Sequence, residues 1–194
     1  MIILSQSLQI SSTDARAAVT QFGEFFSSTV RTPRLEIAFS NFTTLDGFAN
    51  AVDQIQYIGG TTPTLLGLNI SLSTMFQERN GMRRDFREFP KTLVLMTDGQ
   101  SNSGGNLTAF RLLRQQFRDR NINVVGIGIT QNVNENEILA LVGGRHNYRP
   151  FNRFSDLYDP GLPIRLGLCD GIWLLYLIYT ISNYFDKILS SCLK

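Results

Sequence analysis

Two polar loops of this chain carry residue types that bind hard metal ions. Asp98 directly follows the apolar run Leu93–Met96, and Thr62 lies in a loop that precedes a helical pattern. A short apolar run ended by turn residues predicts a strand buried on both faces, and α/β sheets bind ligands at the carboxyl ends of such strands. Carboxylate and hydroxyl oxygens suit Mg²⁺, Ca²⁺ and Mn²⁺. Asp98 and Thr62 are therefore candidate ligands; alternatively, Asp98 only caps the turn after its strand.

A third polar loop, Ser5–Gln9, follows the short apolar start of the chain, Met1–Leu4. If this start is the end of a strand, the hydroxyl of Ser7 lies at the same sheet edge as Thr62 and Asp98. Three loops at one edge of a parallel sheet can converge on a single ion. The alternative is that these polar residues only cap turns.

The remaining sequence gives little support to catalysis. His146 is the single histidine, and no CxxC or HExxH motif is present, which disfavours a zinc site or a Ser-His-Asp triad. The Gly59-Gly60 loop lacks the Gly-Lys-Ser/Thr of a phosphate loop. Gly126 and Gly128 lie inside an apolar run, where close packing of a helix on a strand explains them better than dinucleotide binding. Asp98 has no evident acid–base motif partner, so we expect no enzyme.

Composition indicates one ordinary globular core. The chain has 194 residues, of which 43% are hydrophobic and 18% charged, and its formal net charge is +2. That charge is too small to argue for nucleic acid as a partner. Cys169 and Cys192 are the only cysteines, and the sequence leaves open whether they pair or are both free. We see no secretory signal peptide at the start of this chain.

The periodicity of apolar residues predicts alternating strands and helices as far as about residue 157. This order predicts an α/β fold: a three-layer, doubly wound, mostly parallel sheet with helices on both faces. Thr62 is a natural N-cap with Pro63 as the first helical residue. The expected helices cover about Thr13–Thr29, Phe48–Ile55, Leu65–Phe76, Leu107–Phe117 and Ile138–Val142, and the expected strands cover Leu35–Phe39, Leu93–Met96, Ile122–Thr130 and Tyr148–Phe151.

The pattern changes beyond Leu157. Gly171–Phe185 carries no charge, and Asp170 and Asp186 bracket it. This stretch is shorter than the roughly 20 residues that span a bilayer. We therefore expect a buried or surface-packed helix here rather than a membrane anchor.

Four segments together resemble the von Willebrand factor type A (VWA) domain family. They are GGTTPTLLGL, LVLMTDGQSN, INVVGIGIT and the FSDL at Phe154–Leu157. The resemblance implies a VWA-like domain over residues 1–158 with a truncated first strand, followed by an atypical apolar tail at 159–194. It also implies a Rossmann-like sheet with a metal-ion-dependent adhesion site, whose threonine ligand is Thr62 and whose second acidic residue is Asp98.

The first metal-site motif departs from the family's Asp-x-Ser-x-Ser. The best register here is Ser5-Gln6-Ser7-Leu8-Gln9, in which only Ser7 matches. Ser5 replaces the aspartate and Gln9 replaces the second serine, so a bound ion would face one carboxylate rather than two. Because affinity for hard ions depends on the number of charged ligands, we expect Mg²⁺, Ca²⁺ or Mn²⁺ to bind weakly or not at all.

The resemblance implies a secreted or cell-surface binding module that recognises a protein ligand of the extracellular matrix or cell surface. Gln100, Ser101 and Asn102, beside Asp98, are candidate partner-binding residues. The alternative is a degenerate, metal-free structural or assembly domain, a fragment of a larger secreted protein. Three sequons, at Asn41, Asn69 and Asn106, are candidate glycosylation sites.

Overall fold

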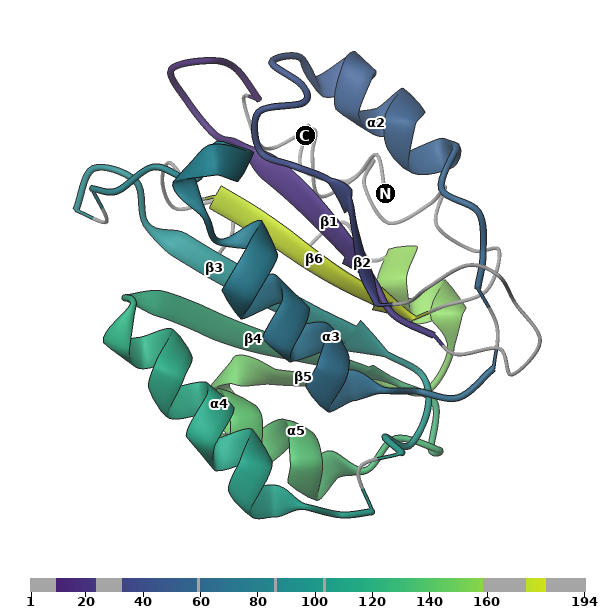
Figure 1. Ribbon diagram of the computed structural model, residues 1–194. Helices are drawn as coiled ribbons and strands as arrows, with labels where there is room; N and C mark the ends of the chain where they lie inside the picture. Colours follow the sequence, from purple (N-terminus) through teal and green to yellow (C-terminus); the bar gives the residue numbers. More distant parts are fainter. Residues whose placement is uncertain are drawn as a thin grey trace.

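The fold is a three-layer α/β arrangement around one sheet (Figure 1). The structure is a computed structural model, and it describes residues 10–23, 33–58, 60–85, 87–102, 104–158 and 174–180. Helices pack against both faces of the sheet, as the sequence predicts.

The sheet has six strands in the order β2-β1-β6-β3-β4-β5. Neighbouring strands run parallel except for β1 and β2, which are antiparallel. The last strand in the sequence therefore lies in the middle of the sheet. The strands are β1 (Ala17–Gln21), β2 (Arg34–Ile37), β3 (Lys91–Thr97), β4 (Ile122–Ile129), β5 (Tyr148–Phe151) and β6 (Leu174–Thr180).

Two apolar cores cover the two faces of the sheet. Phe48 and Val52 of α2 pack with Val94 and Met96 of β3 on one face, where Leu157 also lies. The helices α3, α4 and α5 contribute to the core on the other face. The helices are α2 (Leu45–Asp53), α3 (Thr64–Ile70), which continues into the π-helical turn η1 (Ser71–Met75), α4 (Leu107–Asp119), α5 (Glu135–Val142), and the short 3₁₀ turns η2 (Glu78–Asn80), η3 (Arg145–Asn147) and η4 (Phe154–Tyr158).

Of the two glycines inside β4, Gly126 confirms the expectation of close helix-to-strand packing, whereas Gly128 packs against a neighbouring strand. A Cβ atom on Gly126 would lie 2.3 Å from Cγ2 of Ile138 on α5. A Cβ atom on Gly128 would lie 2.7 Å from the hydroxyl oxygen of Tyr148 on β5. Both positions thus lack the space for a larger residue.

The predicted helix over Thr13–Thr29 is wrong where the structure describes it. Asp14 donates its backbone N–H to Oγ of Ser11 at 2.8 Å, as in a helix cap, but a strand follows this turn. All residues of β1 are buried, because the strand has a strand on each side and an apolar core above and below. Its sequence therefore lacks the alternation of a half-exposed strand. Residues 24–29 lie outside the described residues.

The predicted helix over Gly171–Phe185 is also wrong for residues 174–180, which form β6. Leu177 pairs in register with Val19 of β1 and with Val94 of β3. A strand between two buried strands is a continuous apolar run, and such a run resembles a buried helix in sequence.

The start of α3 differs from the expectation by one residue. Pro63 is the N-cap and Thr64 the first helical residue, so the hydroxyl of Thr62 does not cap this helix. The backbone carbonyl of Thr62 accepts a hydrogen bond from the N–H of Thr64 at 2.8 Å. Thr62 therefore belongs to the loop before the helix, and its side chain faces the loop that follows β3.

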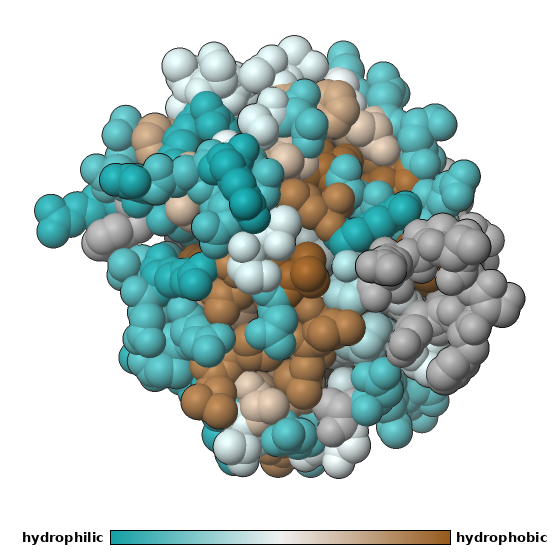
Figure 2. All heavy atoms as spheres, in the orientation of Figure 1, coloured by the Kyte–Doolittle hydropathy of each residue, from teal (hydrophilic) through white to brown (hydrophobic). Residues whose placement is uncertain are grey.

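The surface over α3 and α4 contains exposed apolar residues. Figure 2 shows hydrophobic atoms gathered on the face of the molecule where these helices lie. Leu66 of α3 and Leu112 of α4 are 52% and 60% exposed. None of the described helices is both long and apolar enough to cross a membrane.

Candidate functional site

The candidate site lies at the edge of the sheet where the parallel strands end. Asp98 directly follows β3, and Thr130 directly follows β4. Thr180, the last residue of β6, pairs in register with Thr97 of β3. Three neighbouring strands therefore end beside Asp98, in the position where sheets of this type bind ligands.

The structure brings Thr62 and Asp98 to the same place. The backbone N–H of Asn102 donates to the carbonyl of Thr62 at 3.0 Å, which joins the loop after β3 to the loop before α3. A Cβ atom on Gly99 would lie 3.1 Å from Oγ1 of Thr62. The threonine hydroxyl thus lies against the residue that follows Asp98, and a side chain at position 99 would crowd it.

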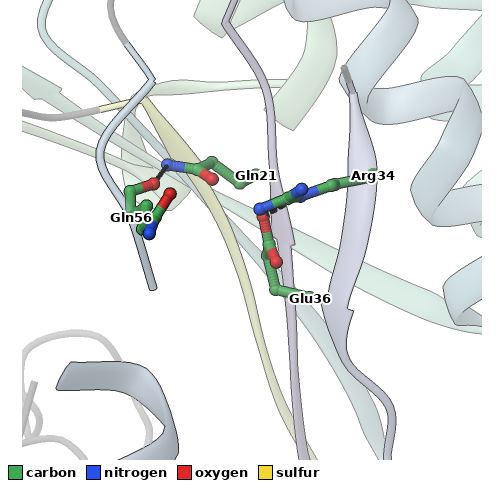
Figure 3. Close-up of polar contacts among 4 residues, drawn as sticks. All are labelled: Gln21, Arg34, Glu36 and Gln56. Atoms are coloured by element: carbon green, nitrogen blue, oxygen red, sulfur yellow. Dashed lines mark hydrogen bonds and ion pairs between the residues drawn. The ribbon is translucent and has the colours of Figure 1, made fainter. Parts of the chain in front are cut away.

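Gln21 anchors the chain just before the Thr62 loop. This last residue of β1 is 1% exposed, and its Nε2 donates to the carbonyl of Gln56 at 2.9 Å (Figure 3). Nearby, Arg34 and Glu36 of β2 form an ion pair. The loop that carries Thr62 therefore begins from a point fixed on β1.

Thr130 fixes the backbone of Asp98 from the other side. Its hydroxyl donates to the Asp98 carbonyl at 3.2 Å, and its own N–H donates to the carbonyl of Phe151 at 2.8 Å. Thr130 has a φ of 73°, a left-handed conformation that is strained for a β-branched residue. The end of β4 thus holds an unfavourable backbone geometry while it positions the Asp98 loop.

The Asp98 side chain lies in a half-buried environment. Burial raises its pKa above the ordinary value for aspartate, because the ionised form loses contact with water. A hydrogen bond from its own backbone opposes this shift in pKa. Among the described residues no cation forms an ion pair with Asp98. A cation placed beside this carboxylate would therefore offset part of the cost of its burial.

Behind the Asp98 loop lies a second carboxylate that sequence reasoning did not identify. Glu137 of α5 is 4% exposed and lines a small cavity with Gly99 and Ser101. The cavity volume is about 10 Å³, room for about one water molecule. The spacing of acidic residues along α5 does not predict that Glu137 is buried. Its side chain turns inward because of the way α5 packs on β4.

The donors at this edge are of the right chemical kind for a divalent ion, but they are few. Asp98 supplies one carboxylate and Thr62 one hydroxyl. Within the described residues there is no group of three or more acidic, histidine or cysteine side chains that could hold a metal ion. Ser7, with Ser5 and Gln9, lies outside the described residues, so its expected role as a ligand stays a prediction.

The surface beside Asp98 presents polar side chains to solvent. Gln100 and Asn102 are exposed, and Ser101 is half-buried. Asn41, Asn69 and Asn106, the candidate glycosylation sites, are exposed as well.

The family model of the von Willebrand factor type A domain matches residues 1–159. The chain belongs to the VWA domain family. The α/β fold that the sequence resemblance implied is thus confirmed, with Thr62 and Asp98 in loops at one edge of the VWA sheet.

Curated relatives of this VWA domain include matrix proteins. The collagen alpha-1(XXI) chain of Xenopus laevis is 21% identical over 141 residues, which is 73% of this chain and 13% of that protein. The human collagen alpha-6(VI) chain is 33% identical over 133 residues, which is 66% of this chain and 6% of that protein. The VWA domain therefore corresponds to a small part of each relative.

Solved structures show the same fold. Proximal thread matrix protein 1 of the mussel byssus, in its second crystal form, superposes with a TM-score of 0.71 at 21% identity, covering 86% of this chain and 40% of that one. A further structure of the mussel protein has a zinc-occupied metal-ion-dependent adhesion site motif and superposes with a TM-score of 0.62 at 18% identity, covering 79% of this chain and 35% of that one.

Proposed function

We propose that this VWA domain is a protein-binding module of the extracellular matrix or cell surface and not an enzyme. The contact surface is the sheet edge around Asp98, Gln100 and Asn102. The observation that carries this proposal is the junction of the Thr62 and Asp98 loops, where the Asn102 N–H meets the Thr62 carbonyl at 3.0 Å. This junction holds exposed polar side chains on a fixed backbone, as specific protein contacts require.

The relatives support an extracellular role for the domain. Both are collagen chains, one from frog and one from human. A polar, pre-organised loop surface on a rigid sheet is a common way to bind a protein without catalysis.

We propose further that the divalent-metal site is weakened or lost. When bound, Mg²⁺, Ca²⁺ or Mn²⁺ supplies a positive charge that a partner's carboxylate can join, and Asp98 and Thr62 are the described residues that would hold it. One carboxylate and one hydroxyl are a weak ligand set for such an ion. Contacts between the partner and Gln100 and Asn102 then supply a larger share of the binding free energy.

Isothermal titration of the full chain with Mg²⁺ and with Mn²⁺ tests the metal proposal. We expect either no binding heat or a Kd on the order of 10⁻³ M, as for weak extracellular sites. Asp98→Ala removes the charged ligand, so we expect it to abolish whatever heat the wild type gives. Micromolar binding by the wild type would contradict a weakened site, and null heats from both proteins would support a site that has lost its metal.

A surface-binding assay tests the partner proposal. Purified type VI collagen is immobilised, and the full chain is compared with the variants Gln100→Ala and Asn102→Ala. We expect each substitution to weaken binding by about 3- to 10-fold, since it removes a polar contact worth about 1 kcal/mol. Gln115→Ala on the exposed face of α4 is the matched control, and equal binding by all variants would exclude this edge as the contact surface.

The alternative is a metal-free structural domain that assembles with other chains. The apolar helix expected at Gly171–Phe185 would have offered a docking surface for such assembly, but residues 174–180 form β6 within the sheet. Assembly remains as an alternative that would act through strand β6 itself.

A further inference from the structure

The middle of the sheet is filled by a strand from far along the sequence. β6 lies between β1 and β3, and within the described residues these two strands do not pair with each other. Each residue from Ala17 to Gln21 has a register partner on β6, and so does each residue from Lys91 to Thr97. Without β6, the sheet would divide into a β2-β1 part and a β3-β4-β5 part with an open slot between them.

The two strands that border this slot, β1 and β3, can pair with a further strand, and their exposure to water would be unfavourable. All residues of β1 and all residues of β3 are buried. Unpaired N–H and C=O groups along two such strands form a template for a further strand. The sequence of β6, LLYLIYT, has no charge, proline or glycine, so it matches a parallel position that is flanked on both sides.

The connection to β6 is long enough to reach beyond its own sheet. Residues 159–173, fifteen in number, join η4 to β6. Because β6 runs parallel to β5 through β3 and β4, the chain must return along the sheet before β6 begins, a distance of about 20 Å for a strand of this length. Fifteen extended residues span up to about 50 Å. The connection is therefore about twice as long as the return along its own sheet requires, which leaves length for β6 to extend toward a second molecule.

We propose that the slot between β1 and β3 is a strand-acceptor site and that a second copy of this chain can donate its β6 to it. Reciprocal exchange completes both sheets with the pairings already present in the single chain: Thr20 with Ile178 on one side and Ile178 with Leu95 on the other. The product is a closed two-fold dimer that needs no new contact surface. The exchange does not depend on Asp98, Gln100 or Asn102 as contact residues, so its tests are separate from those of the proposed function.

Shortening the connection tests exchange directly. In a full chain lacking residues 161–170, five residues join η4 to β6 and span at most about 17 Å, less than the return along the sheet. We expect this variant to have twice the monomer mass by light scattering and to unfold cooperatively on heating. A cooperatively unfolding monomer, or an aggregate without a cooperative transition, would overturn the exchange.

A proline in β6 tests the acceptor slot. Ile178→Pro in the full chain removes a backbone donor in the middle of β6, so we expect its thermal midpoint to fall by about 10 °C or more relative to Ile178→Val. A synthetic peptide of residues 171–183 is expected to bind this variant one-to-one and restore the transition, while a scrambled peptide does not. The slot does not accept this strand if Ile178→Pro has the same thermal midpoint as Ile178→Val. The same conclusion follows if the peptide has no effect when it is present during refolding.

Discussion

At the scale of single residues, the partial burial of the Asp98 carboxylate destabilises the folded domain. Burial raises the pKa of this carboxyl, and within the described residues no cation pairs with it. A site that holds a cation needs a carboxylate that is not already paired with a positively charged side chain. The same arrangement lowers the stability of the metal-free domain.

The pH dependence of stability follows from the direction of this shift. Well below pH 3.8, the ordinary pKa of an aspartate, Asp98 is protonated in both the folded and the unfolded state and does not change the free energy of unfolding. As pH rises, the unfolded state ionises first, so the free energy of unfolding falls until the pH exceeds the raised folded pKa. The penalty is fully present at neutral pH.

Asp98→Asn should therefore stabilise the metal-free domain at pH 7 and leave its stability unchanged near pH 3. We expect a gain of less than about 1 kcal/mol, because the side chain keeps part of its contact with solvent. Urea unfolding at both pH values measures it. Glu88→Gln, at an exposed acid, is the control, and a loss of stability at pH 7 in Asp98→Asn alone would contradict this account of burial.

Thr130 offers a second test at the residue scale. Thr130→Val keeps the branched side chain but removes the hydroxyl that donates to the Asp98 carbonyl at 3.2 Å. We expect a loss of about 1 kcal/mol in the free energy of unfolding, since the partly buried Asp98 carbonyl loses its hydrogen-bond donor. Thr130→Ser keeps the hydroxyl and is expected to stay within about 0.5 kcal/mol of wild type in chemical denaturation. Equal losses in both variants would assign the effect to shape rather than to the hydrogen bond.

At the scale of elements, the contact between β4 and α5 depends on glycine. Gly126 lets α5 approach so closely that a Cβ atom there would lie 2.3 Å from Cγ2 of Ile138. This distance is far inside van der Waals contact, so an added methyl group must displace the helix.

Gly126→Ala is expected to lower the free energy of unfolding by about 1–3 kcal/mol through overpacking. The double variant Gly126→Ala with Ile138→Ala removes the opposing methyl group, and we expect it to be more stable than the sum of the two single changes predicts. Thermal or urea unfolding of the wild type, the two single variants and the double variant gives the coupling free energy between positions 126 and 138. Strict additivity would show that the clash is relieved elsewhere.

Two elements show what the sequence could not predict. The spacing of Ala15, Ala18, Val19 and Phe22 matches a helix, yet β1 is a strand because β2 and β6 flank it. The apolar run at 171–185 gave no alternation for the same reason. Each of these two strands has a neighbouring strand on both sides, and local periodicity carries no information about such neighbours. The strands β3 and β4 were predicted correctly because each contains a continuous apolar run, and Asp98-Gly99 marks the end of the first.

At the scale of the whole molecule, sequence and structure agree on the layer architecture, and the structure brings the loops of Thr62 and Asp98 together. Thr62 and Asp98 could be predicted because each follows a clear strand or precedes a clear helix. Gln21 and Thr130 could not, since their roles depend on which loops the sheet order brings together. The third strand that ends beside Asp98 is β6, from late in the chain, because strand order in a sheet is not sequence order.

The central position of β6 has a consequence for biosynthesis. A ribosome completes residue 158 before it makes the twenty-two residues 159–180, which takes about 1–4 seconds at about 5–20 residues per second. During that interval the nascent halves of the sheet expose the buried sides of β1 and β3. Chaperones that recognise apolar segments would have their best opportunity to bind this chain in those seconds.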